Sequence, residues 1–250
     1  MLLFKQPESN HNGDCTICFT PLRSDGTKGC VMMCCSKFVC IGCDYANSIR
    51  ELEGKLEPRC AFCRHPRPVT VEEADRLTAK RAAVNDPIAM CQMGNMCCME
   101  RDYKSAYEYH SKAAALGEPG AHFSLSNLYR TGQGVDKDKK KEIYHLEEAA
   151  IGGHPGARQH LAIYEWDDNN FERAIKHLTI AATLGHDDSL DFLKAAYTNG
   201  YVSKEVLASA LRAHQAAINA TVTPQREKAE EDIEMIKAAS AALQSQAVST

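Results

Sequence analysis

The feature that most restricts the fold of this chain is a cluster of cysteines near its N-terminus. Of the twelve cysteines in the sequence, nine lie between Cys15 and Cys63. Disulfides are rare in reducing compartments, so cysteines at this density indicate thiolates that bind a metal. A bound metal also replaces the hydrophobic core that so short a segment cannot build. We therefore expect a small zinc domain over residues 13–66.

The spacing of these cysteines indicates how the metal is bound. A Cys-x-x-Cys turn directs two sulfurs at one ion, and two tetrahedral zinc ions need eight ligands. The ligands expected here, in chain order, are Cys15, Cys18, Cys34, Cys35, Cys40, Cys43, Cys60 and Cys63. We expect the first and third pairs to hold one ion and the second and fourth pairs to hold the other. This interleaving braces the chain across itself.

The second of these sites is less determined by spacing, because Cys34 and Cys35 are adjacent. Two neighbouring side chains direct both sulfurs at one metal only if the backbone is suitably bent. Cys30, His65 and His11 are therefore alternative ligands for this site. If the site is degenerate, the expected stoichiometry is one zinc instead of two.

The cysteine segment resembles a RING finger, and two further positions carry the resemblance. Ile17 lies inside the first cysteine pair, where RING fingers place an apolar residue that contacts a ubiquitin-conjugating enzyme. Arg64 follows the last cysteine and matches the linchpin arginine that bonds the conjugating enzyme and ubiquitin. The resemblance implies a ubiquitin ligase with no covalent catalyst, in which Arg64 restricts ubiquitin to a reactive pose. A central helix is expected over residues 44–56.

Three positions differ from the RING pattern. Lys37 lies where RING fingers place a histidine or cysteine ligand, Ala61 replaces a proline, and Asn47 replaces an aromatic residue. A lysine ammonium does not ligate zinc while it is protonated. These differences favour an alternative function, a non-enzymatic scaffold or adaptor with a structural zinc finger.

The rest of the chain repeats itself. Alanine pairs followed by a turn glycine recur at Ala113, Ala149 and Ala181, about 34 residues apart, and a period of this size means stacked helical hairpins. A degenerate fourth copy is expected at Ala216. The pattern resembles the Sel-1-like repeat, most completely over residues 121–153. That resemblance implies an all-α superhelix whose concave face binds other proteins, which in a ligase would include the substrate.

The expected organisation is a small cross-braced, RING-like zinc domain joined to an all-α helical-repeat solenoid. Thr70 and Glu73 have the Ser/Thr-x-x-Glu spacing typical of a helix N-terminus, so a linker helix is expected between the two units. The segments are a loose tail over 1–12, the zinc domain over 13–66, the linker helix over 67–85, repeats over 86–220, and a capping helix with a disordered tail over 221–250.

Charge and hydropathy exclude several classes of partner. The formal net charge is −4, whereas nucleic-acid-binding domains usually carry a basic surplus, so we expect no nucleic-acid partner. No apolar run is long enough to span a bilayer or to form a signal peptide, so a cytoplasmic or nuclear protein without a membrane partner is expected. The scattered histidines, and Cys91, Cys97 and Cys98 among methionines, are interpreted as ordinary structural residues.

Overall fold

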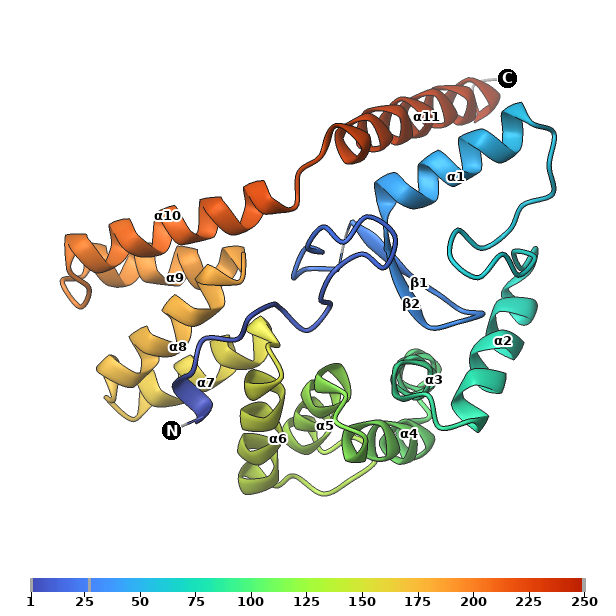
Figure 1. Ribbon diagram of the computed structural model, residues 1–250. Coiled ribbons are helices and arrows are strands. Elements are labelled where there is room, and N and C mark those ends of the chain that lie inside the picture. The colour runs from blue at the N-terminus through green and yellow to red at the C-terminus, as the bar shows by residue number, and fades with distance from the viewer. Residues whose placement is uncertain (1, 27, 249–250) are drawn as a thin grey trace.

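The computed structural model describes residues 2–26 and 28–248. The helices are η1 (Leu2–Phe4), α1 (Ile41–Glu53), α2 (Val71–Ala83), α3 (Pro87–Met99), α4 (Tyr103–Ala115), α5 (Pro119–Thr131), α6 (Lys139–Ile151), α7 (Pro155–Asp167), α8 (Phe171–Thr183), α9 (Asp187–Thr198), α10 (Lys204–Ala220) and α11 (Pro224–Val248). The strands are β1 (Gly29–Met32) and β2 (Lys37–Cys40). Helices α2 to α10 follow one another around an arc, and the N-terminal region lies inside that arc (Figure 1).

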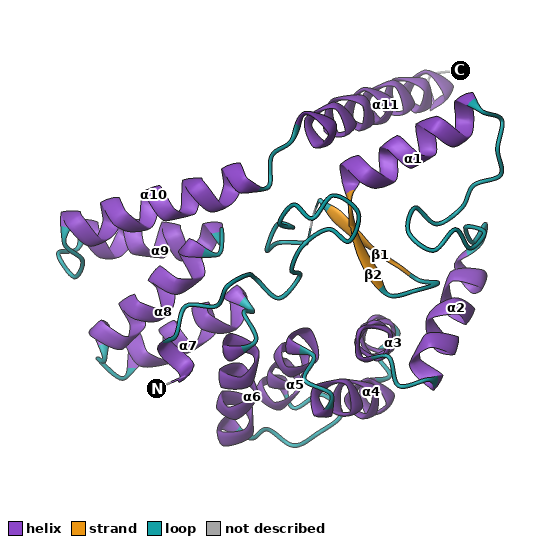
Figure 2. Cartoon of the chain, in the orientation of Figure 1, coloured by secondary structure: helices purple, strands orange, loops and turns teal. Residues whose placement is uncertain are grey.

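The N-terminal module is built around a single hairpin and one helix (Figure 2). Strands β1 and β2 pair antiparallel, with Gly29 opposite Cys40 and Met32 opposite Lys37. Helix α1 begins directly after β2. The buried core of the module contains Leu22 and Val39 together with several cysteines. With so few large apolar side chains, the cysteines form much of the module's interior.

Three helical hairpins form the middle of the array, and each packs its two helices together: α3 with α4, α5 with α6, and α7 with α8. Pro87, Pro119 and Pro155 open the first helix of each hairpin, at a position whose amide has no partner within the helix. The turn glycines at the hairpin ends adopt left-handed backbone angles, at Gly117, Gly153 and Gly185. The predicted stack of helical hairpins is therefore confirmed.

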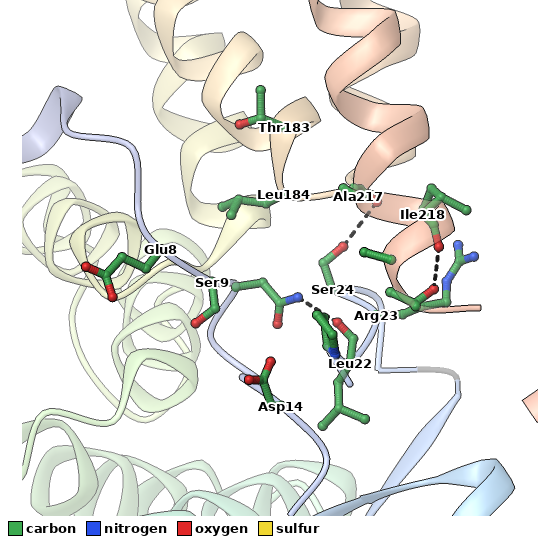
Figure 3. A pocket seen from close by; sticks show the side chains of 15 residues that line it. Glu8, Ser9, Asp14, Leu22, Arg23, Ser24, Thr183, Leu184, Ala217 and Ile218 are labelled. Atoms are coloured by element: carbon green, nitrogen blue, oxygen red, sulfur yellow. Dashed lines mark hydrogen bonds between the residues drawn. The ribbon is translucent and has the colours of Figure 1, made fainter. Parts of the chain in front are cut away.

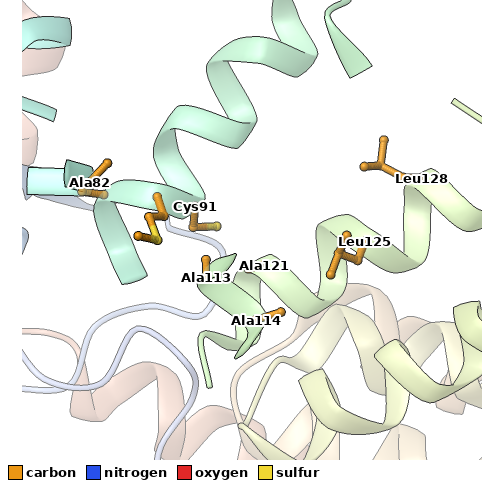
Figure 4. Packing of buried hydrophobic residues seen from close by; sticks show 9 residues of the cluster. Ala82, Cys91, Ala113, Ala114, Ala121, Leu125 and Leu128 are labelled. Atoms are coloured by element: carbon orange, nitrogen blue, oxygen red, sulfur yellow. The ribbon is translucent and has the colours of Figure 1, made fainter. Parts of the chain in front are cut away.

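Small buried side chains let the helices approach closely. Ala113, Ala149 and Ala181 are each 0% exposed. Around Ala113, Figure 4 shows a cluster that includes Cys91, Ala121 and Leu125. Cys91 is buried there as core filler, in agreement with the sequence interpretation.

The two ends of the array differ in how closely they follow the expected pattern. Helix α2 lies in the expected linker segment, and Thr70 caps it by accepting a hydrogen bond from the amide of Glu73. At the other end, α10 packs on α8 and α9, and in this segment, where a fourth copy is expected, Ala210 is buried and Ala216 is exposed. Within the described residues, none of the helices combines the length and the apolar character needed to cross a bilayer.

The C-terminal helix does not cap the repeats as the sequence suggested. Helix α11 instead runs beside α1 of the N-terminal module (Figure 1). Ile236 of this helix is 59% exposed. The segment expected as a disordered tail continues the helix to Val248, and residues 249–250 lie outside the described residues. The expected helix is present, but the sequence held no information on its partner.

The N-terminal segment also differs from the expected loose tail. Residues 2–12 lie against the inner side of the array, where the buried Arg158 donates a hydrogen bond to the Leu3 carbonyl at 2.7 Å. The amide of His11 donates to the Gly153 carbonyl at 3.2 Å. These contacts join main-chain atoms to residues far along the chain, which a hydropathy pattern does not detect.

His110 has an unusual position among the buried residues of the array. It is 0% exposed, three residues before Ala113, where the next two copies have Leu146 and Leu178. Its ring packs so closely on Gly94 that a Cβ there would lie 2.6 Å from the ring. Neither ring nitrogen has a hydrogen-bond partner among the described residues. Burial lowers the pKa of His110 to about 4.

We predict that His110→Leu makes the array more resistant to acid. Below about pH 6.5 the His110 ring takes up a proton in the unfolded chain, whereas burial keeps it neutral in the folded chain down to about pH 4. The free energy of unfolding therefore decreases as the pH falls from 6.5 toward 4. The difference in unfolding free energy between pH 7.5 and 5.5 should shrink by about 1 kcal/mol in the variant. Urea unfolding followed by the fluorescence of Trp166, the single tryptophan, measures this difference. If the variant and the wild type showed the same difference in unfolding free energy between the two pH values, His110 would not be the source of the acid sensitivity.

Candidate metal centre

Four cysteines from three parts of the module form the first thiol group, here called cluster one: Cys15, Cys18, Cys40 and Cys43. Their sulfurs all lie within 4.8 Å of one another. A β-bridge between Asp14 and Pro21 closes the loop that carries the first pair. Cys40 ends β2 and caps α1, and Cys43 lies in the first turn of that helix. Cys15 and Cys40 are 0% and 1% exposed, so cluster one is an interior site.

The second group, cluster two, consists of Cys34, Cys35, Cys60 and Cys63, and its sulfurs also lie within 4.8 Å of one another. The adjacent pair occupies the turn between β1 and β2. Cys60 and Cys63 lie on a loop closed by the bridge between Arg59 and Pro66. Cys34 and Cys63 approach most closely, with their sulfurs 3.3 Å apart, and Cys63 is exposed. Cluster two is thus nearer the surface than cluster one.

The structure brings the cysteines together in the interleaved order that their spacing suggested. The other candidate ligands lie outside both groups. The Cys30 sulfur faces the Val39 carbonyl at 3.8 Å, and the ring of His11 packs on His154 with centroids 4.2 Å apart. His65 is exposed, with Nδ1 2.8 Å from the Pro66 carbonyl oxygen. Cys34 and Cys35 therefore complete the second group without a substitute ligand.

Backbone amides point at the sulfurs in both clusters. The Cys40 amide donates to the Cys15 sulfur at 3.3 Å, and the Cys43 amide donates to the Cys40 sulfur at 3.4 Å. In cluster two, the amides of Phe62 and Cys63 approach the Cys60 sulfur at 3.4 and 3.5 Å. Such amides stabilise negative charge on sulfur and orient metal ligands. The donor set fits a thiolate-bound metal in each cluster.

The electrostatics of cluster one also suit a cation. Burial would raise the pKa of Cys18, but hydrogen bonds involving Thr20 and the neighbouring cysteines bring it down to about 6. Burial and the nearby Cys40 raise the pKa of Cys43. Four neighbouring thiolates repel one another in an interior site, so full deprotonation requires a positive ion among them. All twelve cysteines of the chain are free thiols and not disulfides.

A residue that sequence reasoning missed lies against cluster one. Arg226 of α11 is 4% exposed, and its Nη2 lies 3.7 Å from the Cys18 sulfur and 3.0 Å from the Thr20 carbonyl oxygen. Its Nη1 donates to the carbonyls of Pro21 and Thr221, both at 2.7 Å. Arg226 therefore ties the C-terminal helix to the loop that carries the first cysteine pair. Nothing in the local sequence distinguishes this arginine from a surface residue.

The close fit of α11 on α1 extends beyond Arg226. A Cβ at Gly42 would lie 3.0 Å from the backbone nitrogen of Arg226, so the helices approach through a glycine. The Tyr45 hydroxyl donates to Asp232 at 2.7 Å, and Lys28 pairs with Glu230 at 2.6 Å. Helix α11 is thus a part of the cysteine-rich module, although it lies at the other end of the chain.

Ile17 and Arg64 lie on one shallow depression of about 410 Å³, together with Asn47 and Ala61. Ile17 is 37% exposed. Arg64 is held by α1, since it donates to the Asn47 side-chain oxygen at 2.6 Å and pairs with Glu51 at 3.1 Å. Burial would raise the pKa of Glu51, but the hydrogen bonds from Arg59, Asn47 and Arg64 lower it. Asn47, at the position where RING fingers have an aromatic residue, therefore orients Arg64 toward its own domain.

The architecture defines a helical-repeat protein that carries a cysteine-rich module with two groups of potential metal ligands. The family model that matches is the Sel1 repeat, over residues 87–118, 119–154 and 167–186. Residues 87–154 and 167–186 of the array therefore match Sel1 repeats. An uncharacterised protein of Neisseria meningitidis serogroup B is 33% identical over 93 residues, which are 36% of this chain and 20% of that protein. The chain thus matches about a fifth of the length of that relative.

Solved structures include similar repeat arrays. A Sel1 repeat protein from Oxalobacter formigenes aligns with a TM-score of 0.53 and 20% identity, covering 79% of this chain and 86% of that one. A protective antigen of uropathogenic Escherichia coli with this repeat fold aligns at a TM-score of 0.48 and 22% identity, covering 76% and 40%. The first of these similarities supports the repeat fold.

Proposed function

We propose that the protein is a non-catalytic interaction scaffold in which a zinc-held module fixes the curvature of a partner-binding Sel1 array. The observation that carries this proposal is that the module contacts both ends of the array. Each thiol cluster would hold one zinc ion through four thiolates, and the ion would supply a structural cross-link between loops. The partner of the array would be another protein.

Helix α2 connects the module to one end of the array, and residues of the module contact the array again near its other end. Arg23 lies 3.6 Å from Asp187 at the start of α9, and the Ser24 hydroxyl donates to the Gly185 carbonyl at 3.2 Å. Figure 3 shows Arg23 and Ser24 at this junction, near Leu184 and Ile218. A cavity of about 480 Å³ remains at this junction, lined by Leu184 and Ile218 among others. In an ordinary solenoid each repeat contacts only its neighbours. Here the contacts across the arc make its curvature depend on the module.

Removal of zinc is expected to open the arc. A strong chelator should raise the radius of gyration measured by small-angle X-ray scattering, while the circular dichroism signal of the repeat helices is largely retained. The reason is that the contacts of Arg23, Ser24 and Arg226 all depend on loops that the clusters organise. Addition of zinc should restore the original scattering curve. Loss of all zinc with an unchanged radius of gyration would contradict the proposal.

A second candidate function is a RING-type ubiquitin ligase. The exposed Ile17 beside the depression at Arg64 supports it, because such a surface would receive a ubiquitin-conjugating enzyme. The pairing of Arg64 with Asn47 and Glu51 favours the scaffold, because it occupies the side chain that a ligase would direct at ubiquitin. An autoubiquitination assay across a panel of conjugating enzymes distinguishes the two. Activity that is lost in both Ile17→Ala and Arg64→Ala would establish the ligase, and inactive wild-type protein supports the scaffold.

A further inference from the structure

The inner surface of helices α6 to α8, here called the inner groove, holds a segment of the chain's own N-terminus. Residues 2–6 lie on it, and η1 contacts both α6 and α8. Leu3 packs against a buried cluster that includes Leu146 and Leu161, and Phe4 lies on His177 with ring centroids 4.7 Å apart. The N-terminal segment therefore has the contacts of a bound peptide.

The floor of the inner groove contains a buried arginine that binds peptide carbonyls. Arg158 of α7 is 0% exposed and donates from Nη1 to the Leu3 carbonyl at 2.7 Å and from Nη2 to the Lys5 carbonyl at 3.3 Å. No carboxylate pairs with Arg158 among the described residues. A buried charge requires such partners, because its desolvation is costly. Since both acceptors are main-chain atoms, the carbonyls of another peptide would satisfy Arg158 equally well.

The N-terminal segment fills the inner groove only in part. Leu2 is 68% exposed, and Lys5 and Gln6 are exposed as well. The Arg158 Nε and both ring nitrogens of His177 are buried without a partner among the described residues. Beyond Phe4 the surface continues into an apolar hollow of about 670 Å³, lined by Phe4, Ile175, Ile180, Tyr201, Val202 and Val206. A longer peptide would gain contacts that residues 2–6 do not make.

We propose that the inner groove is a binding site for a peptide with an aliphatic residue followed by an aromatic one, and that residues 2–6 occupy it as an internal competitor. This inference rests on the proposed scaffold function and identifies the site where the array takes its protein partner. Leu3 and Phe4 define the side-chain chemistry, and Arg158 recognises the main chain. A partner must displace the N-terminal segment before it binds.

The test uses the full-length chain with the groove vacated by the double substitution Leu3→Ser and Phe4→Ser. The probe is a fluorescein-labelled peptide with the sequence of residues 2–12, and its binding is measured by fluorescence anisotropy. The substituted chain should bind the peptide, and the wild type should bind it at least tenfold more weakly, because a tethered segment competes at an effective concentration of the order of millimolar. A peptide carrying the same two serines should not bind. No binding to the vacated chain, or equal binding to the wild type, would overturn the proposal.

A second variant tests the contacts of Arg158 by proteolysis, with the folding of the protein checked in parallel. Arg158→Gln in the full-length chain should release the N-terminal segment, so trypsin should cut after the exposed Lys5 several-fold faster than in the wild type. Zinc content and Trp166 fluorescence report whether the module and the array remain folded. An unchanged cleavage rate in folded Arg158→Gln protein would count against the carbonyl contacts. The scattering test of the scaffold does not involve the peptide, so the two proposals fail independently.

Discussion

Replacement of Cys40 by serine is expected to unfold the N-terminal module and to release the zinc of cluster one. Cys40 is 1% exposed, lies 3.8 Å from the Cys18 sulfur, and caps helix α1. The module has few large apolar side chains, so metal binding must supply most of its stability. In zinc-finger peptides that contribution is on the order of 10 kcal/mol, which exceeds the net stability of many domains. Metal analysis and proteolysis within residues 13–66 measure the effect.

Cys30→Ser is the matched control for this substitution. Cys30 lies on the partner strand and pairs in register with Val39, next to Cys40, but it belongs to neither cluster. The control should retain both zinc ions and the protease resistance of the wild type. If Cys40→Ser retained two ions and a folded module, cluster one would not be the metal site.

Replacement of Arg226 by methionine is expected to detach α11 from the module and to weaken metal binding in cluster one. The substitution removes the arginine donor of the Pro21 and Thr221 carbonyls, leaves the Thr20 carbonyl with only the Cys15 amide, and removes the positive charge beside Cys18. A buried carbonyl left without its donor costs about 1–3 kcal/mol. Loss of a group that supports metal ligands typically lowers metal affinity about 10- to 100-fold. Competition with a chelator of known affinity, and hydrogen exchange of the α11 amides, measure the two effects.

Lys237→Met provides the comparison, because Lys237 is on the same helix, its side chain is 67% exposed, and it pairs with Glu234 one turn away. It should leave metal affinity and hydrogen exchange unchanged. If Arg226→Met and Lys237→Met had the same metal affinity and the same hydrogen exchange of the α11 amides, α11 would contribute nothing to the metal site.

The parts of the structure that the sequence predicted are those set by short-range spacing. Cys-x-x-Cys turns direct sulfurs at a common point whatever lies around them, so the interleaved grouping was predictable. The period of the alanine pairs likewise predicted the stacked hairpins, because small residues before a turn are required wherever two helices pack closely. Proline at helix starts and glycine at helix ends then mark the boundaries.

The parts that the sequence did not predict depend on contacts between distant segments. Arg226 reaches residues such as Cys18 from the opposite end of the chain, and Arg158 binds carbonyls at the N-terminus. The sequence predicts a helix after residue 221 but not whether that helix packs on the repeats or on α1. His110 was hidden for a different reason, because a buried histidine replaces the leucine of the other copies without changing the helical period.

We propose that two four-thiolate zinc sites hold the module that spans the repeat array. Metal analysis of natively purified protein combined with zinc X-ray absorption spectroscopy tests this proposal directly. We expect two zinc ions per chain, each with four sulfur ligands at about 2.3 Å. Protein that is folded without zinc, or zinc with nitrogen or oxygen ligands in place of the cysteine sulfurs, would contradict it.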